Sequence, residues 1–393
     1  MANIGKTGFI FDKSSSKNEK HGTILIHSVQ SIKDFNIFFR IPWTIYKNDP
    51  FWVPPLWNEY RAFFDKDNLF WTHADTKLFI AYQHQKPVGR IAVFYDKKFA
   101  EQVKQKTGFF GYFESVNDTS IAHHLLNSAK EWLINQSIKH IQGPVNGRVD
   151  MGCGILIKGF NHLPYFYGTY TPPYYQQLLE SYGMKKNKDL VSYELDLHKT
   201  IPSTVQQSAK RCLSSGISIR RFNRLRTNKE LEWWIPLMMD VFSHHWGYIQ
   251  VSEEEVRNRF GIKELRYIVD PGLFLVAEKN KKPVGFKWSF PDYNQVFKKM
   301  NGHIGIKEML QFLWLKRNIN RGKFHFVGVK KECRGLGIGT CMNHFMLKEM
   351  KKRGYHSVEI GWIDEKNTGE RRATEKIGAE LSKIYRVYKS SFK

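Results

Sequence analysis

One arrangement of short elements occurs twice in the sequence, and this repetition limits the possible folds more than any other feature. In the first half, the apolar runs Leu78 to Tyr82 and Val88 to Tyr95 flank a polar turn and predict a β-hairpin. In the second half, Leu273 to Glu278 and Val284 to Phe290 flank a similar turn. Both hairpins contain Leu-Phe followed by Lys-Pro-Val-Gly. Turns favour these residues, so chance recurrence is the alternative to the duplication that we infer.

The segments after each hairpin strengthen the case for duplication, because each half continues with a strand, a helix and another strand. The predicted elements are Thr107 to Glu114, Ser120 to Gln136 and Ile138 to Gly143 in the first half, and Lys323 to Val329, Gly339 to Arg353 and Ser357 to Trp362 in the second. A helix that connects two strands is typical of a βαβ unit. A helix from Thr368 to Ile377 and a terminal strand from Leu381 to Tyr388 complete the chain. The order predicts an α/β fold with a mixed sheet in each half.

A chain of 393 residues is longer than a single hydrophobic core usually grows, which favours two domains. Residues 1–22 are polar and lack the apolar centre of a signal peptide, so we expect a disordered tail. We expect a first domain over residues 23–200, a linker over 201–230 and a second domain over 231–393.

The net charge of +24 predicts an anionic partner, although it also serves solubility. A nucleic acid, an anionic membrane surface and a phosphorylated small molecule are all compatible with this charge. The four cysteines form no CxxC pair, which argues against zinc and disulfides and favours a reducing cytoplasm. No apolar run is long enough to span a membrane.

The segment from Val329 to Gly339 carries the clearest chemical signal, because it lies between a predicted strand and a predicted helix. Arg334 is followed by glycines at positions 335, 337 and 339. Such glycines allow a tight turn and expose backbone N–H groups, to which the positive end of the next helix adds its field. A diphosphate binds well to such a nest of amides. The alternative is that the glycines only permit close packing of strand and helix.

The order of these features resembles the GNAT superfamily of N-acetyltransferases over the last 120 or so residues. The strand ending at Val329, the Arg-Gly-Leu-Gly-Ile-Gly turn, the strand ending at Trp362, Asn367 and the turn Ile377 to Ala379 carry the resemblance. It implies acetyl-CoA or a longer acyl-CoA as acyl donor, and no metal. It also implies that the first strand splays, that its Val329 backbone pairs with the pantetheine arm, and that Asn367 contacts that arm. The implied cofactor-binding residues are Val329, Arg334, Gly335, Leu336, Gly337, Ile338, Gly339, Thr340 and Asn367.

Further stretches resemble bacterial tandem-GNAT proteins of similar length, in which two GNAT-like folds follow each other. These stretches are Pro50 to Leu56, Gly108 to Glu114, Gly143 to Asn146, Thr171 to Tyr175, Lys188 to Leu190, Pro291 to Gln295 and Glu359 to Trp362. Only the second half has an intact CoA motif, since the first continues from Ser115 to Asp118 without arginine or spaced glycines. We expect the first domain to be degenerate, to form a wall of the acceptor groove and to support the catalytic domain.

Acyl transfer to an amine requires a base and an acid for the departing thiolate. Glu359 and Asp292 are the candidate bases, and a structurally paired carboxylate is the alternative for each. The resemblance implies a tyrosine acid where this chain has Thr374, so Tyr385 or Tyr388 is a candidate replacement, with packing as the alternative role. If neither acts, the thiolate leaves unprotonated.

Aromatic residues in the first half could line a groove for a long acyl chain or an amphipathic amine. They are Trp43, Trp52, Trp57, Phe63, Phe64, Phe70 and Trp71, and an ordinary core is the alternative.

Our main hypothesis is a cytoplasmic N-acyltransferase in which an amine attacks acyl-CoA directly in a ternary complex. The amine is either small or lipid-like, such as a sphingoid base, and the lipid case implies peripheral contact with an anionic inner membrane face. A non-catalytic acyl-CoA sensor or scaffold is the alternative. Nucleic-acid binding rests on charge alone, and the oligomeric state, monomer or homodimer, stays open.

Overall fold

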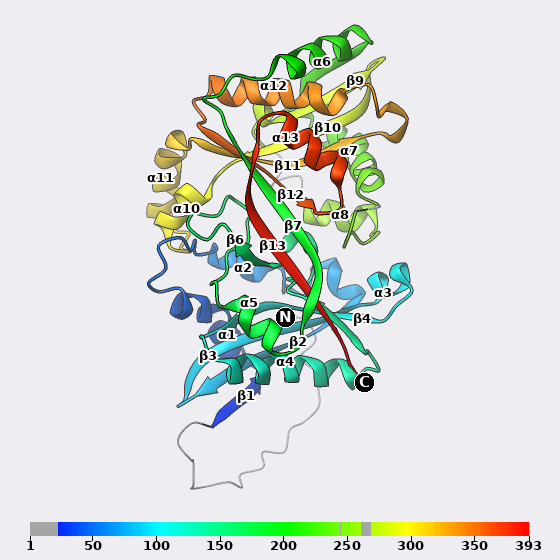
Figure 1. Cartoon of the computed structure of the whole chain (residues 1–393). Helices are drawn as coiled ribbons and strands as arrows, with labels where there is room; N and C mark the ends of the chain where they lie inside the picture. Colours follow the sequence, from blue (N-terminus) through cyan, green and yellow to red (C-terminus); the bar gives the residue numbers. More distant parts are fainter. Residues whose placement is uncertain (1–22, 244, 261–268, 393) are drawn as a thin grey trace. The chain divides into compact units, whose positions relative to one another are not determined.

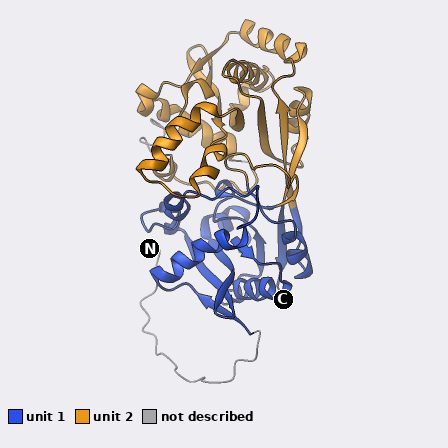
Figure 2. Ribbon diagram, turned by 90° about the vertical axis from the view of Figure 1, so that its left-hand side faces the viewer, with its two compact units in different colours: residues 1–155, 169–187, 386–393 blue, residues 156–168, 188–385 orange. Residues whose placement is uncertain are grey.

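The computed structural model describes residues 23–243, 245–260 and 269–392, so the expected tail over residues 1–22 lies outside the described residues. The chain divides into two compact units, which Figure 2 shows in different colours. Unit 1 comprises residues 1–155, 169–187 and 386–393, and unit 2 comprises residues 156–168 and 188–385. Each unit therefore contains a short segment from elsewhere in the sequence.

Unit 1 is built on a sheet in which the predicted hairpin and βαβ unit are both present. Strands β1, β2, β3 and β4 pair antiparallel in that order, and β4 pairs parallel with β5. The last residues of β13, Tyr388 to Ser391, add an antiparallel strand next to β5. These strands are β1 (Ile24–Ser28), β2 (Ala74–Gln83), β3 (Lys86–Asp96), β4 (Thr107–Ser115), β5 (His140–Gly143) and β13 (Glu380–Ser391).

Helix α4 (Thr119–Ile134) forms the crossover between β4 and β5, and its apolar face is buried, as its periodicity predicts. Unit 1 also contains α1 (Ile32–Ile45), α2 (Trp57–Ala62), α3 (Lys97–Val103) and α5 (Tyr175–Ser181). Of the aromatic residues expected to line a groove, Phe63, Phe64 and Phe70 are at most 5% exposed. Phe64 also stacks on Trp71 with 5.6 Å between ring centroids, which favours the core interpretation.

Unit 2 repeats this plan, which confirms the predicted duplication (Figure 1). The hairpin of β9 and β10 pairs antiparallel with β11, and β11 pairs parallel with β12 across α12. Strand β8 pairs with the free edge of β9, and β7 pairs antiparallel with β12. The elements are β7 (Lys185–Asp196), β8 (Ile217–Arg221), β9 (Phe274–Lys279), β10 (Lys282–Pro291), β11 (Arg321–Val329), α12 (Ile338–Lys352) and β12 (Ser357–Asp364).

Helices cover both faces of the sheet in unit 2. One core contains Trp234 of α7 and Val256 of α8 together with Phe286 and Trp288 of β10. The other contains Cys212 of α6, Val284 of β10 and Ile338 of α12. The helices of this unit are α6 (Ser203–Ser214), α7 (Thr227–Phe242), α8 (Glu253–Arg259), α10 (Asn294–Met300), α11 (Ile306–Leu315), α12 and α13 (Thr368–Lys376).

The interval 201–230, which the sequence analysis interprets as a linker, contains regular elements in the structure. It holds α6, β8, the 3-10 turn Arg224–Arg226 and the start of α7. Helix α6 is polar overall but buries Val205, Ala209 and Cys212 at helical spacing, a short pattern that its polar neighbours obscure. The division into units also differs from the expected boundaries at residues 200 and 231.

Strand β6 (Ile155–Lys158) pairs with β13 outside the main strand order. The remaining elements are single 3-10 turns: η1 (Leu69–Thr72), η2 (Val149–Met151), η3 (Arg224–Arg226), η4 (Pro271–Leu273), η5 (Lys316–Asn318) and η6 (Lys331–Cys333). Across the described ranges, no helix combines the length and the hydropathy that crossing a bilayer requires.

Candidate functional site

The turn between β11 and α12 adopts an open conformation that depends on its glycines. Gly335 and Gly337 have φ values of +86° and +73°, in the left-handed region that glycine adopts without steric cost. A Cβ atom built on Gly335 or Gly339 would meet nothing within 4 Å, so the space beside both residues is empty of protein. The backbone on this side of the turn is therefore accessible.

Helix α12 begins at this turn with its first amides free for a ligand. Gly337 is the N-cap residue, no side chain caps the helix, and its first turn contains no acidic residue. Ile338 is only 2% exposed and Leu336 packs against the same core, so apolar side chains hold the turn in place. The first amides of a helix lack intrahelical partners and lie at the positive end of its dipole. The turn thus has the features of an anion-binding nest.

The other predicted residues of this turn lie at its borders. Val329 is the last residue of β11 and pairs with Gly285 of β10. The exposed Arg334 donates from Nε to the Val329 carbonyl at 3.4 Å, which leaves the rest of its guanidinium for solvent or a ligand. Thr340 lies in the first turn of α12 and is half-buried.

The equivalent helix of unit 1 starts differently. Its N-cap residue is Asp118, whose carboxylate accepts from the backbone N–H groups of Ser120 and Ile121 at 2.8 and 3.2 Å. A carboxylate of the chain itself therefore uses the amides that a phosphate would need. This agrees with the predicted loss of the CoA motif from the first half.

Strands β11 and β12 diverge next to the nest. Their parallel pairing extends only from Arg321 and Ser357 to Phe324 and Ile360, although β11 continues to Val329. On its other side, β11 pairs with β10 through a bulge at His325, since Trp288 pairs with Phe326 and Ser289 with Phe324. Between residues 325 and 329, β11 thus has an edge that β12 does not cover, and an extended ligand can pair with such an edge.

Asn367 is the N-cap of α13. Its Oδ1 accepts from the backbone N–H of Glu370 at 3.2 Å, and its Nδ2 donates to Glu370 Oε2 at 2.9 Å. The Asn367 side chain thus caps the helix and is itself held by the side chain of Glu370. The side chain is exposed, so its predicted contact with a CoA arm is sterically open.

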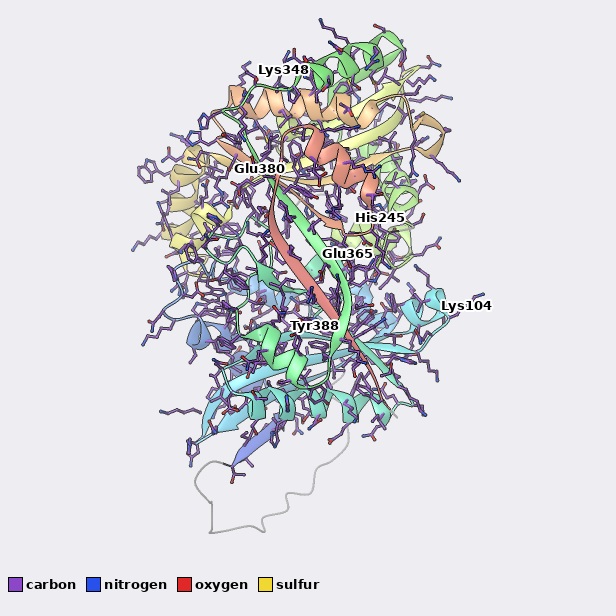
Figure 3. The ribbon with its side chains drawn as sticks, viewed as in Figure 1. Lys104, His245, Lys348, Glu365, Glu380 and Tyr388 are labelled. Carbon is purple, nitrogen blue, oxygen red and sulfur yellow. The ribbon has the colours of Figure 1, made fainter. Side chains whose placement is uncertain are left out.

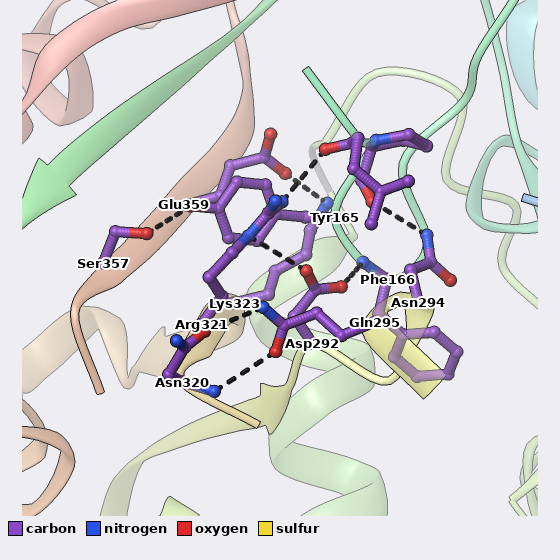
Figure 4. Close-up of polar contacts among 12 residues, drawn as sticks. Tyr165, Phe166, Asp292, Asn294, Gln295, Asn320, Arg321, Lys323, Ser357 and Glu359 are labelled. Carbon is purple, nitrogen blue, oxygen red and sulfur yellow. Dashed lines mark hydrogen bonds and ion pairs between the residues drawn. The ribbon is translucent and has the colours of Figure 1, made fainter. Parts of the chain in front are cut away.

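Glu359 is fully buried and contacts two lysines, one of which, Lys323, is labelled with it in Figure 4. Lys323 Nζ lies 2.9 Å from Oε2, and Lys383 Nζ lies 3.2 Å from Oε1. Burial alone would raise the pKa of Glu359, but the two ammonium groups lower it below its ordinary value. A carboxylate held in its charged form by two cations is a weak proton acceptor.

Asp292 follows β10 directly and is also fully buried. Its Oδ1 accepts from the Phe166 N–H at 2.8 Å, and Arg321 Nε lies 3.1 Å from Oδ2 (Figure 4). Burial raises the pKa of Asp292 to about 6, with Arg321 opposing the shift. Its protonation therefore changes near neutral pH.

The tyrosines proposed as acids are both buried. Tyr385 is 1% exposed, while Tyr388, labelled in Figure 3, belongs to unit 1 and donates to Glu180 Oε1 at 2.9 Å. Thr374 is 4% exposed. All three residues predicted to be catalytic, Glu359, Asp292 and Tyr385, are therefore shielded, and their assignment stays a prediction.

Two titratable residues next to the diverging strands were not predicted from the sequence, and the first of them is His325. It forms the bulge of β11, is half-buried, and stacks on Tyr167 with 5.1 Å between ring centroids. Burial, Lys323 and Arg259 together lower its pKa well below 6.5. The imidazole is thus neutral at physiological pH and able to accept a proton.

The second missed residue is Lys287 of β10. It is 3% exposed, and its Nζ lies 3.6 Å from the ring centroid of Phe324, the last residue of β11 that pairs with β12. Burial lowers its pKa to about 7, although Glu370 opposes this. The signal for both residues was present in the sequence, because each interrupts an apolar strand with a titratable side chain.

Comparison with known proteins agrees with this geometry. The family model of the Acetyltransferase (GNAT) family matches residues 238–379, which contain the diverging strands, the glycine turn and α12. This part of the chain therefore belongs to the GNAT acetyltransferase family. In the described part of the chain, no group of three His, Cys, Asp or Glu residues could hold a metal ion.

Two relatives match nearly the whole chain. A protein named bacterial ceramide synthase from Caulobacter vibrioides is 27% identical over 376 residues, covering 92% of this chain and 96% of that protein. Protein YghO of Escherichia coli is 26% identical over 370 residues, covering 93% and 94%. A solved tandem GNAT protein from the clavulanic acid biosynthesis pathway superimposes with a TM-score of 0.56 at 10% identity, covering 94% of this chain and 98% of that one. The fold is therefore a tandem of two GNAT-like folds.

Proposed function

We propose that this protein is an acyl-CoA-dependent N-acyltransferase whose acceptor is a long-chain amine of the sphingoid class. The GNAT fold supports acyl transfer in general. One observation supports the donor site most strongly, namely the uncapped, glycine-lined start of α12 beside the uncovered edge of β11.

In this proposal, the backbone amides from Gly335 to Thr340 bind the diphosphate of the donor. Arg334 and the neighbouring Lys330 and Lys331 add positive charge, which strengthens contacts with phosphate oxygens. The pantetheine arm pairs with the uncovered edge of β11 from Val329 towards His325. This path brings the thioester to the bulge at His325, while Lys287 lies on the neighbouring strand, where it pairs with Val327.

His325 accepts the proton that the amine loses as its nitrogen forms a bond to the thioester carbonyl. A neutral imidazole is required for this step, and the lowered pKa of His325 supplies it. The carbon–sulfur bond then breaks, and Lys287 protonates the departing thiolate. With a pKa of about 7, Lys287 has both forms available at neutral pH, as a general acid needs.

The long-chain acceptor is supported by the relative from Caulobacter vibrioides, which matches over nearly its full length. A ceramide is the amide of a fatty acid and a sphingoid base, so its synthesis is an N-acylation of a long-chain amine. The surroundings of His325 suit such a substrate, because Tyr167, Phe290 and Phe326 all contact the imidazole ring. The desolvated site would disfavour a small, strongly hydrated amine.

The direct test is an acylation assay with matched acceptors. Purified protein is incubated with acyl-CoA of graded chain length and either a long-chain sphingoid base or a short soluble amino alcohol with the same head group. We expect the long-chain amide, seen by mass spectrometry, and free CoA in equal amounts. Acylation of the short amine at equal efficiency would reject the acceptor class but retain the chemistry.

The second candidate function is a non-catalytic acyl-CoA sensor, which the burial of Glu359, Asp292 and Tyr385 favours. A sensor would be stabilised thermally by acyl-CoA and would release no CoA with any amine. Release of CoA that depends on His325 would exclude it.

A further inference from the structure

Helix α11 has a strongly apolar face that is exposed in the described part of the protein. Five of its residues are well exposed: Ile306 86%, Met309 49%, Leu310 63%, Leu313 45% and Trp314 67%. Successive members lie alternately three residues and one residue apart, which places them on a single side of a helix with a period of 3.6. Soluble proteins rarely expose such a group together.

The opposite side of α11 fixes the helix to unit 2. The ring centroid of Phe312 lies 5.7 Å from Tyr293 and 6.1 Å from Phe297, both on or next to α10, and Leu315 is buried. Helix α10 begins at Asn294, two residues after Asp292, which follows the hairpin strand β10 at the candidate site. The exposed face thus belongs to a packed helix of the catalytic unit (Figure 1).

Basic residues surround this face. Between residues 298 and 317 there are five lysines and arginines, Lys298, Lys299, Lys307, Lys316 and Arg317, against one acid, Glu308. Of these basic residues, all except Lys298 are exposed. An apolar stripe with a tryptophan and a basic border is the composition of helices that lie in a membrane interface.

We propose that α11 docks the protein onto an anionic lipid bilayer, with its apolar face among the head groups and its basic border against lipid phosphates. This inference deepens the proposed function and rests on it, because a long-chain amine resides in a membrane and has to be taken from there. Each basic residue near an anionic surface adds to binding. A second copy of this chain fits the face less well, since its own basic border would be repelled.

The test is co-sedimentation of the full chain with lipid vesicles in the absence of acyl-CoA. Vesicles of phosphatidylcholine alone are compared with vesicles of equal parts phosphatidylcholine and phosphatidylglycerol. We expect binding to the mixed vesicles, and a loss of at least about tenfold in the variant Ile306→Ser, Leu310→Ser, Trp314→Ser, since three exposed apolar side chains no longer insert. Each of Lys307→Gln and Lys316→Gln should weaken binding about fivefold.

Leu225→Ser is the matched control, because Leu225 is 82% exposed in the same unit but lies outside α11. It should bind vesicles as the unchanged protein does, and all variants should retain the melting temperature and circular dichroism of that protein. Equal vesicle binding by the triple variant, or a dimer in solution that only this variant abolishes, would overturn the proposal.

The outcomes also separate this inference from the proposed function. Vesicle binding without acylation of any amine would support docking and reject the function. If the protein acylates a detergent-solubilised sphingoid base but does not bind vesicles, the result would support the function and overturn docking.

Discussion

The ammonium of Lys323 lies 2.9 Å from the carboxylate of Glu359, and both side chains are almost completely buried. Lys383 contacts the other carboxylate oxygen, so one acid joins lysines from β11 and β13 to β12. Such a cluster is costly to desolvate, but removing one partner costs more because it leaves the others uncompensated. We therefore assign Glu359 to holding these strands together.

The variant Glu359→Gln should lose about 3–5 kcal/mol of unfolding free energy, measured by urea denaturation at neutral pH. The pKa of Glu359 is lowered, so its contribution is present above the unfolded value of 4.5 and is lost as pH falls through the folded value. A triple variant, Lys323→Met, Glu359→Leu and Lys383→Met, is the control and should recover most of the lost stability. A stable but inactive Glu359→Gln protein would instead favour the catalytic role predicted from the sequence.

Replacing the buried Lys287 by methionine should stabilise the fold while impairing turnover. Its pKa falls from 10.5 to about 7 on folding, which corresponds to a cost of about 3–5 kcal/mol at neutral pH. Because the unfolded state binds the proton more tightly, this cost grows as pH falls from about 10 to about 7 and is constant below. The gain in Lys287→Met, measured by urea denaturation, should therefore be small at pH 10 and large at pH 7.

The same residue gives kcat a pH dependence. If protonated Lys287 donates to the thiolate, kcat in the unchanged protein should fall as pH rises above about 7. The residual activity of Lys287→Met should lack this decline. A decline that persists in the variant would assign it to another group.

His325→Ala should lower kcat about 10²- to 10⁴-fold and leave acyl-CoA affinity unchanged, because the imidazole acts on the amine rather than on the nucleotide. Added imidazole should restore part of the activity, which a purely structural loss would not allow. The pKa of His325 lies well below 6.5, so its base form persists as pH falls from 8 to about 6. His303→Ala, at an exposed histidine in the same unit, is the control.

Much of the fold could be predicted from the sequence, because hairpins, amphipathic helices and the glycine turn leave local patterns. The repeated hairpins and βαβ units follow directly from alternation and helical periodicity. Helix α6 was missed because its buried face has only three residues, Val205, Ala209 and Cys212, among mostly polar neighbours. The passage of the chain's last strand into unit 1 depends on tertiary pairing between Tyr388 and Gly143, for which no local signal exists.

The candidate site was predictable to the extent that it is built from backbone. Gly335 and Gly337 mark the nest because few other residues adopt their conformation, and Gly339 leaves open space beside the helix start. The roles of the ionisable residues were harder to predict from the sequence, because burial and neighbouring groups decide those roles. Glu359 was a candidate base because it is a carboxylate on a central strand, but only the structure reveals its contacts with two lysines. His325 depends on a bulge that arises from the pairing of β10 with β11.

The proposal that open amides after Val329 bind the diphosphate of acyl-CoA can be tested with two matched glycines, one before and one after α12. Gly335 and Gly354 have φ values of +86° and +77°, and a Cβ on either meets nothing within 4 Å. Alanine at either position should therefore cost a similar ~1 kcal/mol of stability. Only Gly335 lies at the proposed nest.

Isothermal titration calorimetry with acyl-CoA tests the claim most directly. We predict one binding site per chain, because Asp118 caps the equivalent helix of unit 1. We further predict that Gly335→Ala weakens binding at least about tenfold, through strain and the added methyl group at the nest, while Gly354→Ala binds normally. Equal affinity in both variants, or no heat with any acyl-CoA in the unchanged protein, would contradict it.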